Sequence, residues 1–299
     1  MKGRLDACAS GITVADGGWS TILQARGVPP AVPAELANLT HPHLVEQLAR
    51  DYVAAGARFI TTNTFSANRF LFERKRIDQD WRAVNRRGAE LSRSAIAGSG
   101  ALVAGSIGPS GKILAVKEAR EEELAAVFAA QAEALAEGGA DLIVLETFSE
   151  LAEILVALEA VRKATALPVI ASMSFDSGPQ RTRTMMGARA EDCATALTEA
   201  GADAVGCNCG TGIATILPAV VALRAHTRLP LWVKPNAGLP ELEDGRVVYR
   251  QTPDEFGQHV PVLLDAGANI IGGCCGTGPE HIRRVAALVH SRGRKSSGR

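Results

Sequence analysis

The chain has 299 residues and is 46% hydrophobic, so it can bury a sizeable core as one large domain. Lys plus Arg and Asp plus Glu each number 32 and aromatic residues make up only 4%, which argues against nucleic acid or an anionic membrane as the main partner. No apolar run reaches about 18 residues and no N-terminal segment is typical of a signal peptide, so we expect a cytoplasmic protein with reduced cysteines.

Eight short apolar runs, each with the length of a strand buried on both faces, follow one another along the chain. They are residues 11–18, 54–65, 101–111, 137–148, 167–175, 200–212, 229–238 and 266–278. Four of them open with Ala-Gly-Ala or Gly-Gly-Ala, whose glycine can cap a preceding helix in a left-handed conformation. Stretches long enough for a helix separate most neighbouring runs.

This alternation predicts an α/β fold, a (β/α)8 TIM barrel that forms a single domain over residues 1–290. A doubly wound sheet is the main alternative, but the turn at residues 16–19 (DGGW), after the first run, lacks a phosphate-binding fingerprint. The basic and polar tail at residues 291–299 is expected to be disordered.

The C-terminal ends of the eight runs are almost all polar. In chain order they present Asp16, Asn63, Ser106, Glu146, Ser174, Cys209, Asn236 and the pair Cys274–Cys275. Catalytic groups of (β/α)8 barrels lie at this end of the strands, and a purely structural barrel would not need such a ring. We therefore expect the functional site at this end of the barrel.

A thirteen-residue segment occurs twice, as AGADAVGCNCGTG at 200–212 and as AGANIIGGCCGTG at 266–278. Alignment of the two copies places Cys209 on Cys275, with Gly-Thr-Gly after each. Thiolates that converge from the ends of two neighbouring strands suit Zn²⁺, and a catalytic zinc site keeps three protein ligands and one open position. We predict that Cys209, Cys274 and Cys275 are the metal ligands and the catalytic residues.

Two features of the cysteines leave alternatives open. Adjacent residues of a regular strand point to opposite faces, so Cys274 and Cys275 can both bind a metal only if the flanking glycines let the backbone turn. A disulfide between these two is a further alternative, although a reducing compartment disfavours it. Cys207 is expected on the same side as Cys209 but one layer deeper, where it either packs in the core or acts as a fourth ligand that closes the site.

Asp16 and Glu146 place carboxylates at the ends of apolar strands, where burial without a partner is costly. They either form structural ion pairs in the barrel mouth or receive the ammonium group of a substrate. Gly17 and Gly18 would leave backbone N–H groups free for a substrate carboxylate.

These residues carry a resemblance to the homocysteine S-methyltransferase family. The matching segments are ADGGWST (15–21), ITTNTFSANR (60–69), AGSIGPSG (104–111), LETF (145–148), GCNCGTG (206–212), VKPNAGLP (233–240) and GGCCGTGPEHI (272–282). The resemblance implies a zinc site at Cys209, Cys274 and Cys275. It also implies that Asp16, Gly17 and Glu146 bind the amino acid moiety of homocysteine. We expect Gly18, Asn63, Asn208 and Asn236, which lie in the same segments, to contact the substrate.

The resemblance implies a zinc-dependent S-methyltransferase that activates homocysteine as a zinc-bound thiolate and methylates it to methionine. The segments at 38–42 (NLTHP), 62–65 (TNTF) and 233–240 are most similar to the homocysteine domain of cobalamin-dependent methionine synthases. The chain ends where the folate and cobalamin modules of those enzymes would begin, so we expect a stand-alone enzyme or the catalytic subunit of a corrinoid system.

The methyl donor stays open among S-methylmethionine, S-adenosylmethionine, a betaine-like compound and a methyl-corrinoid protein. Ser66 replaces the aromatic residue of betaine-using enzymes, and the region around Leu36 lacks their tryptophan, which disfavours betaine. Two other classes are alternatives: a non-catalytic protein with a structural four-cysteine zinc site, and a barrel that uses its thiols for redox work without metal. A homo-oligomer is possible, while no nucleic acid or membrane partner is expected.

Overall fold

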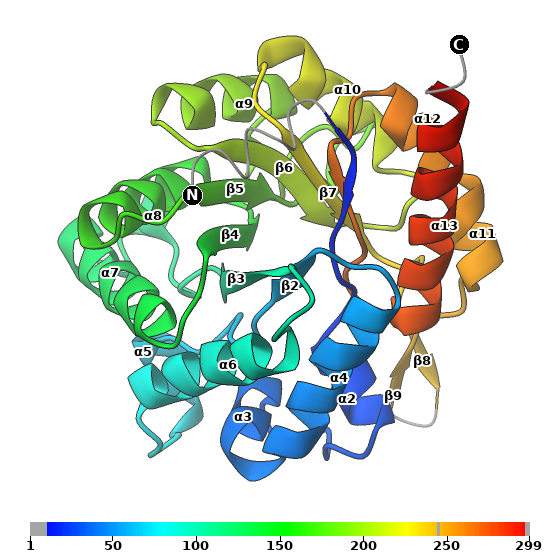
Figure 1. Cartoon of the computed structure of the whole chain (residues 1–299). Helices are drawn as coiled ribbons and strands as arrows, with labels where there is room; N and C mark the ends of the chain where they lie inside the picture. Colours follow the sequence, from blue (N-terminus) through cyan, green and yellow to red (C-terminus); the bar gives the residue numbers. More distant parts are fainter. Residues whose placement is uncertain (1–10, 244–245, 297–299) are drawn as a thin grey trace.

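The computed structural model describes residues 11–243 and 246–296. Eight strands form the central barrel, and helices surround it (Figure 1). The barrel strands are β1 (Thr13–Val14), β2 (Phe59–Thr61), β3 (Leu102–Ile107), β4 (Leu142–Phe148), β5 (Val169–Met173), β6 (Ala204–Cys209), β7 (Leu231–Pro235) and β10 (Ile270–Ile271). Each of the eight predicted apolar runs contains one of these strands.

The helices follow the strands along the chain. They are α2 (Ser20–Ala25), α3 (Ala37–Thr40), α4 (Pro42–Ala54), α5 (Arg69–Lys75), α6 (Trp81–Ala95), α7 (Glu121–Glu137), α8 (Leu151–Ala164), α9 (Ala190–Glu199), α10 (Leu217–His226), α11 (Pro253–Gln258), α12 (Val260–Asp265) and α13 (Pro279–Ser296), with 3-10 turns η1 (Ala34–Leu36) and η2 (Leu114–Val116). A two-stranded antiparallel hairpin, β8 (Glu241–Glu243) and β9 (Arg246–Val248), follows β7.

The sheet runs in the order β1-β10-β7-β6-β5-β4-β3-β2, and all neighbouring strands in it are parallel. A parallel bridge between Ala15 and Phe59 joins the two edges, since the Asp16 N–H donates to the Phe59 carbonyl at 3.0 Å. The ring of strands is thereby closed, and the predicted single-domain (β/α)8 barrel is confirmed.

The strands read as continuous apolar runs because both of their faces are buried. One face packs against the surrounding helices, and the other fills the barrel interior. The interior residues are Ala15, Phe59, Ala104, Leu142, Val144, Ile170, Ala204, Trp232 and Ile270. The Trp232 ring meets the Phe59 ring edge-on at 5.9 Å between centroids. Gly206 allows the close approach of β7, because a Cβ at that position would lie 2.0 Å from the Trp232 carbonyl oxygen and 2.7 Å from the Trp232 Cβ.

The glycines that open four of the predicted runs have the expected conformation. Gly56, Gly139, Gly201 and Gly267 all have positive φ, between 85° and 104°. Each of them follows the C-terminal end of a helix, where a left-handed residue lets the chain leave the helix and enter the next strand. The prediction of glycine caps is confirmed.

The C-terminal boundary differs from the prediction. Helix α13 continues through Ser296, so the predicted domain end at residue 290 falls inside a helix. Arg292 pairs with Asp265 at 2.5 Å, and basic residues are favourable in the last turns of a helix. Residues 1–10 and 297–299 of the predicted segments lie outside the described residues.

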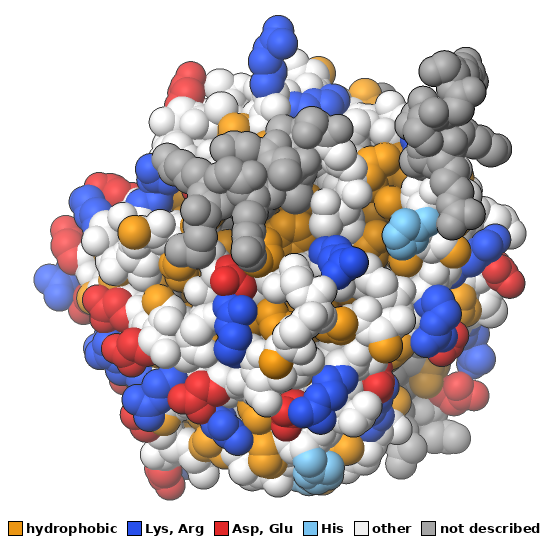
Figure 2. All heavy atoms as spheres, viewed as in Figure 1, with side chains coloured by type: hydrophobic (Ala, Val, Ile, Leu, Met, Phe, Trp, Pro, Cys, Tyr) orange, Lys and Arg blue, Asp and Glu red, His pale blue; other side chains and the backbone are white. Residues whose placement is uncertain are grey.

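The described surface carries both signs of charge. Basic and acidic side chains are interspersed over the face shown in Figure 2, in keeping with the equal numbers of the two in the sequence. Among the described residues, none of the helices is long and apolar enough to span a membrane.

Candidate active site

A cavity of about 190 Å³ lies at the C-terminal ends of the strands, above the apolar barrel interior. Seven of the ten predicted site residues line it: Gly17, Gly18, Asn63, Glu146, Cys209, Cys274 and Cys275. The other three, Asp16, Asn208 and Asn236, are buried behind its wall. Ser106 from the predicted ring also lines the cavity, whereas Ser174 does not.

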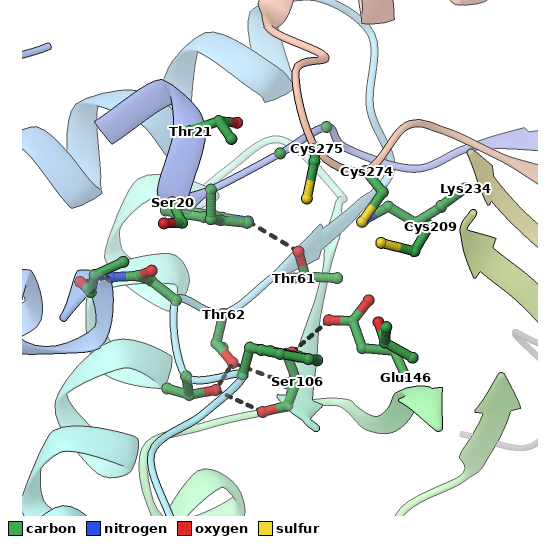
Figure 3. A pocket seen from close by; sticks show the side chains of 18 of the residues that line it. Ser20, Thr21, Thr61, Thr62, Ser106, Glu146, Cys209, Lys234, Cys274 and Cys275 are labelled. Carbon is green, nitrogen blue, oxygen red and sulfur yellow. Dashed lines mark hydrogen bonds between the residues drawn. The ribbon is translucent and has the colours of Figure 1, made fainter. Parts of the chain in front are cut away.

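The three predicted thiols converge at one side of this cavity. The Sγ atoms of Cys209, Cys274 and Cys275 all lie within 4.8 Å of one another, and Figure 3 shows them pointing into the same space. A tetrahedral zinc with Zn–S bonds of about 2.3 Å places its sulfur ligands roughly 3.8 Å apart. The donor set and its spacing therefore fit a zinc ion with one coordination position left for a further ligand.

Cys209 faces the cavity because the backbone changes conformation at the end of β6. Asn208 points into the barrel, where its Oδ1 accepts from the Ser172 hydroxyl at 2.7 Å, so a regular strand would turn Cys209 outward. Instead Cys209 has φ of 65°, in the left-handed region, and Gly210 follows with φ of 72°. A non-glycine residue in this region costs roughly 1–3 kcal/mol, and such strain is concentrated at functional sites.

Cys274 and Cys275 lie on a turn and not on a strand, because β10 ends at Ile271. The Cys274 N–H donates to the Pro235 carbonyl at 2.8 Å, and the Cys275 N–H donates to Asn236 Oδ1 at 3.0 Å. Gly273 is required for this turn, because a Cβ there would lie 2.2 Å from the Thr277 hydroxyl oxygen. The rule that adjacent strand residues point to opposite faces therefore does not apply to Cys274 and Cys275. Both thiols reach the cavity, as the glycines of this segment predicted.

Cys207 does not face the same side as Cys209, and this expectation is wrong. It is fully buried in the outer core, between the barrel and the helices, and burial raises the pKa of its thiol to about 12. The group of side chains found among the described residues that could hold a metal ion contains three cysteines, without Cys207. The geometry therefore gives no support to a four-cysteine site.

Asn208 and Asn236 hold the cysteine-bearing segments in place. Asn208 accepts from the Thr147 N–H at 2.9 Å and donates to the Thr147 hydroxyl at 2.6 Å, which ties β6 to the irregular end of β4. Asn236 donates to the Gly210 carbonyl at 2.7 Å while its Oδ1 accepts from Cys275, so it bridges the two cysteine loops. Both amides are engaged by the protein, and their predicted contact with substrate stays a prediction.

Asp16 is fully buried and forms an ion pair with Lys234, whose Nζ lies 2.5 Å from Asp16 Oδ1. Asp16 Oδ2 accepts from the Trp19 indole N–H at 3.0 Å and from the Thr61 N–H and hydroxyl, both at 2.7 Å. Both carboxylate oxygens of Asp16 therefore have partners within the protein. Of the two interpretations of Asp16, these contacts match the structural ion pair.

Lys234 lines the cavity, and the sequence analysis did not single it out. Its position follows the strand alternation, because it lies two residues after the inward-facing Trp232 on β7. Burial alone would lower the pKa of Lys234, but the carboxylates of Asp16 and Glu146 outweigh this effect and raise it. The ammonium group of Lys234 is therefore charged, and its main counter-charge is the Asp16 carboxylate.

Glu146 is the carboxylate that faces the cavity, with 8% of its surface exposed. Its Oε1 accepts from the Ser106 hydroxyl, and its other oxygen points toward the side of the cavity that holds the cysteines (Figure 3). Burial raises the pKa of Glu146, while the Lys234 ammonium and the Ser106 hydrogen bond oppose this shift. An added ammonium group would stabilise its charged form.

The remaining predicted residues, Asn63, Gly17 and Gly18, also line the cavity. Asn63 donates to the Ala34 carbonyl at 2.7 Å and to Asn38 Oδ1 at 3.1 Å, which secures the loop after β2. The Gly18 N–H donates to the Thr277 carbonyl at 2.8 Å and is not free for a substrate. The Gly17 N–H makes no hydrogen bond within the described residues. Of the two glycine amides, only that of Gly17 therefore agrees with the prediction of an N–H free to donate to a substrate carboxylate.

His281 anchors the segment that follows the cysteines. The Gly278 N–H donates to its Nδ1 at 3.3 Å, so the ring proton resides on Nε2, which donates to the Gln251 carbonyl at 2.9 Å. Phe256 packs edge-on against the ring, with 5.7 Å between centroids. Burial lowers the pKa of His281, although the Gln251 carbonyl and the charge of Glu280 oppose this shift.

This lowered pKa predicts a loss of stability in acid. The folded state favours the neutral ring of His281, so the unfolded chain binds the extra proton as the pH falls through about 6.5. We expect the free energy of unfolding of metal-free protein, measured with urea, to fall as the pH is lowered from 7 toward 5.5. The slope should be smaller in His281→Gln, and an equal slope in the variant would exclude His281 as its source.

Fold and site together define a (β/α)8 barrel with three converging thiols that could hold a metal ion and a buried carboxylate at its mouth. The homocysteine S-methyltransferase family model matches residues 13–289, and the chain belongs to this family.

Known relatives agree with this assignment. The chain is 32% identical to the methionine synthase of Mycobacterium tuberculosis over 95% of its own length and spans 25% of that protein. It is 31% identical to the S-methylmethionine–homocysteine S-methyltransferase BHMT2 of Mus musculus, over 95% of this chain and 80% of that protein. The metallated form of the homocysteine methyltransferase MmuM from Escherichia coli matches with a TM-score of 0.78 and 28% identity, over 93% of this chain and 96% of that one.

Proposed function

We propose that this protein methylates homocysteine to methionine and that it activates the homocysteine thiol on a Zn²⁺ ion held by Cys209, Cys274 and Cys275. The observation that carries the proposal is the convergence of three Sγ atoms within 4.8 Å in the barrel mouth. Three protein ligands leave one tetrahedral position for the substrate. The match to a metallated methyltransferase of the same family supports the proposal.

The bound metal would supply one chemical change, the deprotonation of the substrate thiol, which ordinarily has a pKa near 8.5. The chain's own residues supply the rest. In this proposal Glu146 binds the substrate ammonium group and the Gly17 N–H donates to the substrate carboxylate. Both residues line the cavity, and the Gly17 N–H has no hydrogen-bond acceptor among the described residues. Asn208 and Asn236 hold the cysteine loops, so the reacting sulfur and the methyl group can be kept in line.

The charge of the cavity favours a cationic methyl donor. Among the described residues that line the cavity, Glu35, Glu146 and Lys234 carry charge, and Lys234 is paired with Asp16. Betaine is a quaternary ammonium carboxylate, so this charge alone does not separate it from a sulfonium donor. Ser66 and the region around Leu36, which lack the aromatic residues of betaine-using enzymes, disfavour betaine. We propose a sulfonium donor of the S-methylmethionine or S-adenosylmethionine type.

A donor panel tests both parts of the proposal. Zinc-loaded protein is incubated with homocysteine and, in separate reactions, with S-methylmethionine, S-adenosylmethionine, betaine and a methyl-corrinoid, and methionine is measured by mass spectrometry. We expect methionine from at least one sulfonium donor. Methionine formed only from betaine or the corrinoid would refute the proposed donor class, and no methionine from any donor would refute the activity.

Replacement of Glu146 by Gln should weaken homocysteine binding. The change removes the charge at nearly constant volume, and a hydrogen bond to a charged group contributes roughly 1.5–3 kcal/mol. We expect the Kd for homocysteine, measured by calorimetry on zinc-loaded protein, to rise roughly ten- to a hundredfold. The zinc content should not change. An unaltered Kd in a zinc-replete variant would contradict the role assigned to Glu146.

A further inference from the structure

Glu35 brings a second carboxylate to the cavity, from the 3-10 turn η1 that precedes α3. Only 6% of the residue is exposed, and its Oε1 accepts from the Ser66 N–H at 3.0 Å and from the Ser66 hydroxyl. The other oxygen, Oε2, makes no hydrogen bond within the described residues, although the protein does not enclose it completely. Since Glu35 lines the cavity, Oε2 is an acceptor available to a bound ligand.

The turn that carries Glu35 is fastened to the loop after β2. The Ala34 carbonyl, next to Glu35 in the chain, accepts from the Asn63 amide at 2.7 Å. Asn38, three residues further on, donates to the Asn63 carbonyl at 2.9 Å. Together with the bonds from Ser66, these contacts fix the carboxylate before a ligand arrives, which lowers the entropic cost of binding.

The Glu35 carboxylate has no counter-charge from the protein. Among the described residues its partner is Ser66, and no Lys, Arg or His side chain pairs with it. Lys234, the basic residue among those that line the cavity, is held by Asp16 at 2.5 Å. A carboxylate is costly to bury without a partner, so this position favours a ligand that brings a positive charge.

The unfilled acceptor also selects the kind of cation. A primary ammonium group has N–H groups that can donate to Oε2 of Glu35, whereas a sulfonium or quaternary ammonium centre has none. Two ammonium groups enter the proposed reaction, one on homocysteine and one on a donor of the S-methylmethionine or S-adenosylmethionine type. The free oxygen of Glu146 points toward the cysteines, where the homocysteine sulfur would bind (Figure 3). Glu35 is then available to the other substrate.

We propose that Oε2 of Glu35 accepts a hydrogen bond from the α-ammonium group of the methyl donor. Glu35 thereby selects donors that are amino acids over donors that lack N–H groups, and it is a specificity-determining residue. The assignment rests on the proposed methyltransferase activity and its sulfonium donor.

Paired donors test the role of Glu35. Zinc-loaded protein is given homocysteine with S-methylmethionine or S-adenosylmethionine, and each is compared with its analogue in which hydrogen replaces the α-ammonium group. We expect kcat/KM to be roughly ten- to a hundredfold higher for the donor with the ammonium group, the effect of one hydrogen bond to a charged group. Glu35→Gln should remove most of this preference. Its one amide oxygen takes the Ser66 bonds, and its NH2 group, which cannot accept, replaces Oε2.

Two controls separate donor selection from a general effect. The preference is a ratio measured on one protein sample, so a partly unfolded variant does not alter it. The Kd of Glu35→Gln for homocysteine, measured by calorimetry, should equal that of the wild type. Glu73→Gln is the matched control, because it removes one charge from the exposed surface of α5 and should keep the wild-type preference.

The outcomes distinguish this inference from the proposed function. A wild-type enzyme that uses an ammonium-free analogue as well as its parent donor overturns the role of Glu35 and leaves the methyltransferase activity intact. The same holds if Glu35→Gln keeps the preference, or if it weakens homocysteine binding instead. If wild-type protein forms no methionine with either parent donor, the proposed sulfonium donor is refuted, and the inference with it.

Discussion

With Cys209 replaced by alanine, we expect zinc binding to weaken at least a hundredfold and methionine formation to become undetectable. Zinc bound by a full set of protein ligands contributes about 10–16 kcal/mol in small zinc domains, so the loss of one of three thiolates removes a large share of the binding energy. Cys274→Ala and Cys275→Ala should behave in the same way, because all three sulfurs belong to one group. Elemental analysis of dialysed protein gives the metal content, and mass spectrometry gives the methionine.

Cys207→Ala is the matched control for these variants. Cys207 lies two residues from Cys209 on the same strand but packs in the outer core. Its replacement removes a buried sulfur and should lower stability slightly, with the zinc content and most of the activity retained. If this variant loses zinc as completely as Cys209→Ala, the assignment of three ligands is wrong.

The barrel and the convergence of the three thiols could be predicted because both are encoded in local patterns. Parallel strands buried on both faces leave uninterrupted apolar runs, and the chain has eight of them at regular spacing. The duplicated Cys-Gly-Thr-Gly ending places Cys209 and Cys275 at equivalent points of two strand–loop units. Equivalent strand ends of a barrel meet at one rim, so this pattern was sufficient to bring the thiols together.

The orientation of Cys207 could not be predicted by the same reasoning. The rule that residues two apart share a face holds only while the strand stays regular, and Cys209 leaves the strand conformation with φ of 65°. Gly210 after it was the one visible sign of a change in the backbone.

The partner of Asp16 could not be predicted either, because Lys234 lies 218 residues further along the chain. The composition and the strand ends identify Asp16 as a buried carboxylate that requires a partner. They do not identify which cation pairs with it. Lys234 did carry a signal, namely a lysine two residues after Trp232 within an apolar run. On a barrel strand that spacing places the ammonium group inside the mouth.

Replacement of Lys234 by methionine should have the largest effect on stability. Lys234 and Asp16 have side chains only 3% and 0% exposed, so the variant would leave a buried carboxylate without its counter-charge. Breaking a buried pair in this way costs about 3–5 kcal/mol. We expect a loss of this size in the free energy of unfolding, measured with urea on metal-free protein so that zinc binding does not contribute.

Two further variants show whether the unpaired charge is the cause. Asp16→Asn combined with Lys234→Met removes both charges and should recover much of the loss, because a buried pair is worth little relative to neutral groups of similar size. Arg250→Gln breaks an exposed ion pair on the hairpin and should change stability by less than about 1 kcal/mol. If Lys234→Met were as stable as the Arg250 variant, Lys234 would not be the counter-charge that the buried Asp16 carboxylate requires. The three other contacts of Asp16, which come from the Trp19 indole N–H and from the Thr61 N–H and hydroxyl, supply hydrogen bonds to the carboxylate but no counter-charge.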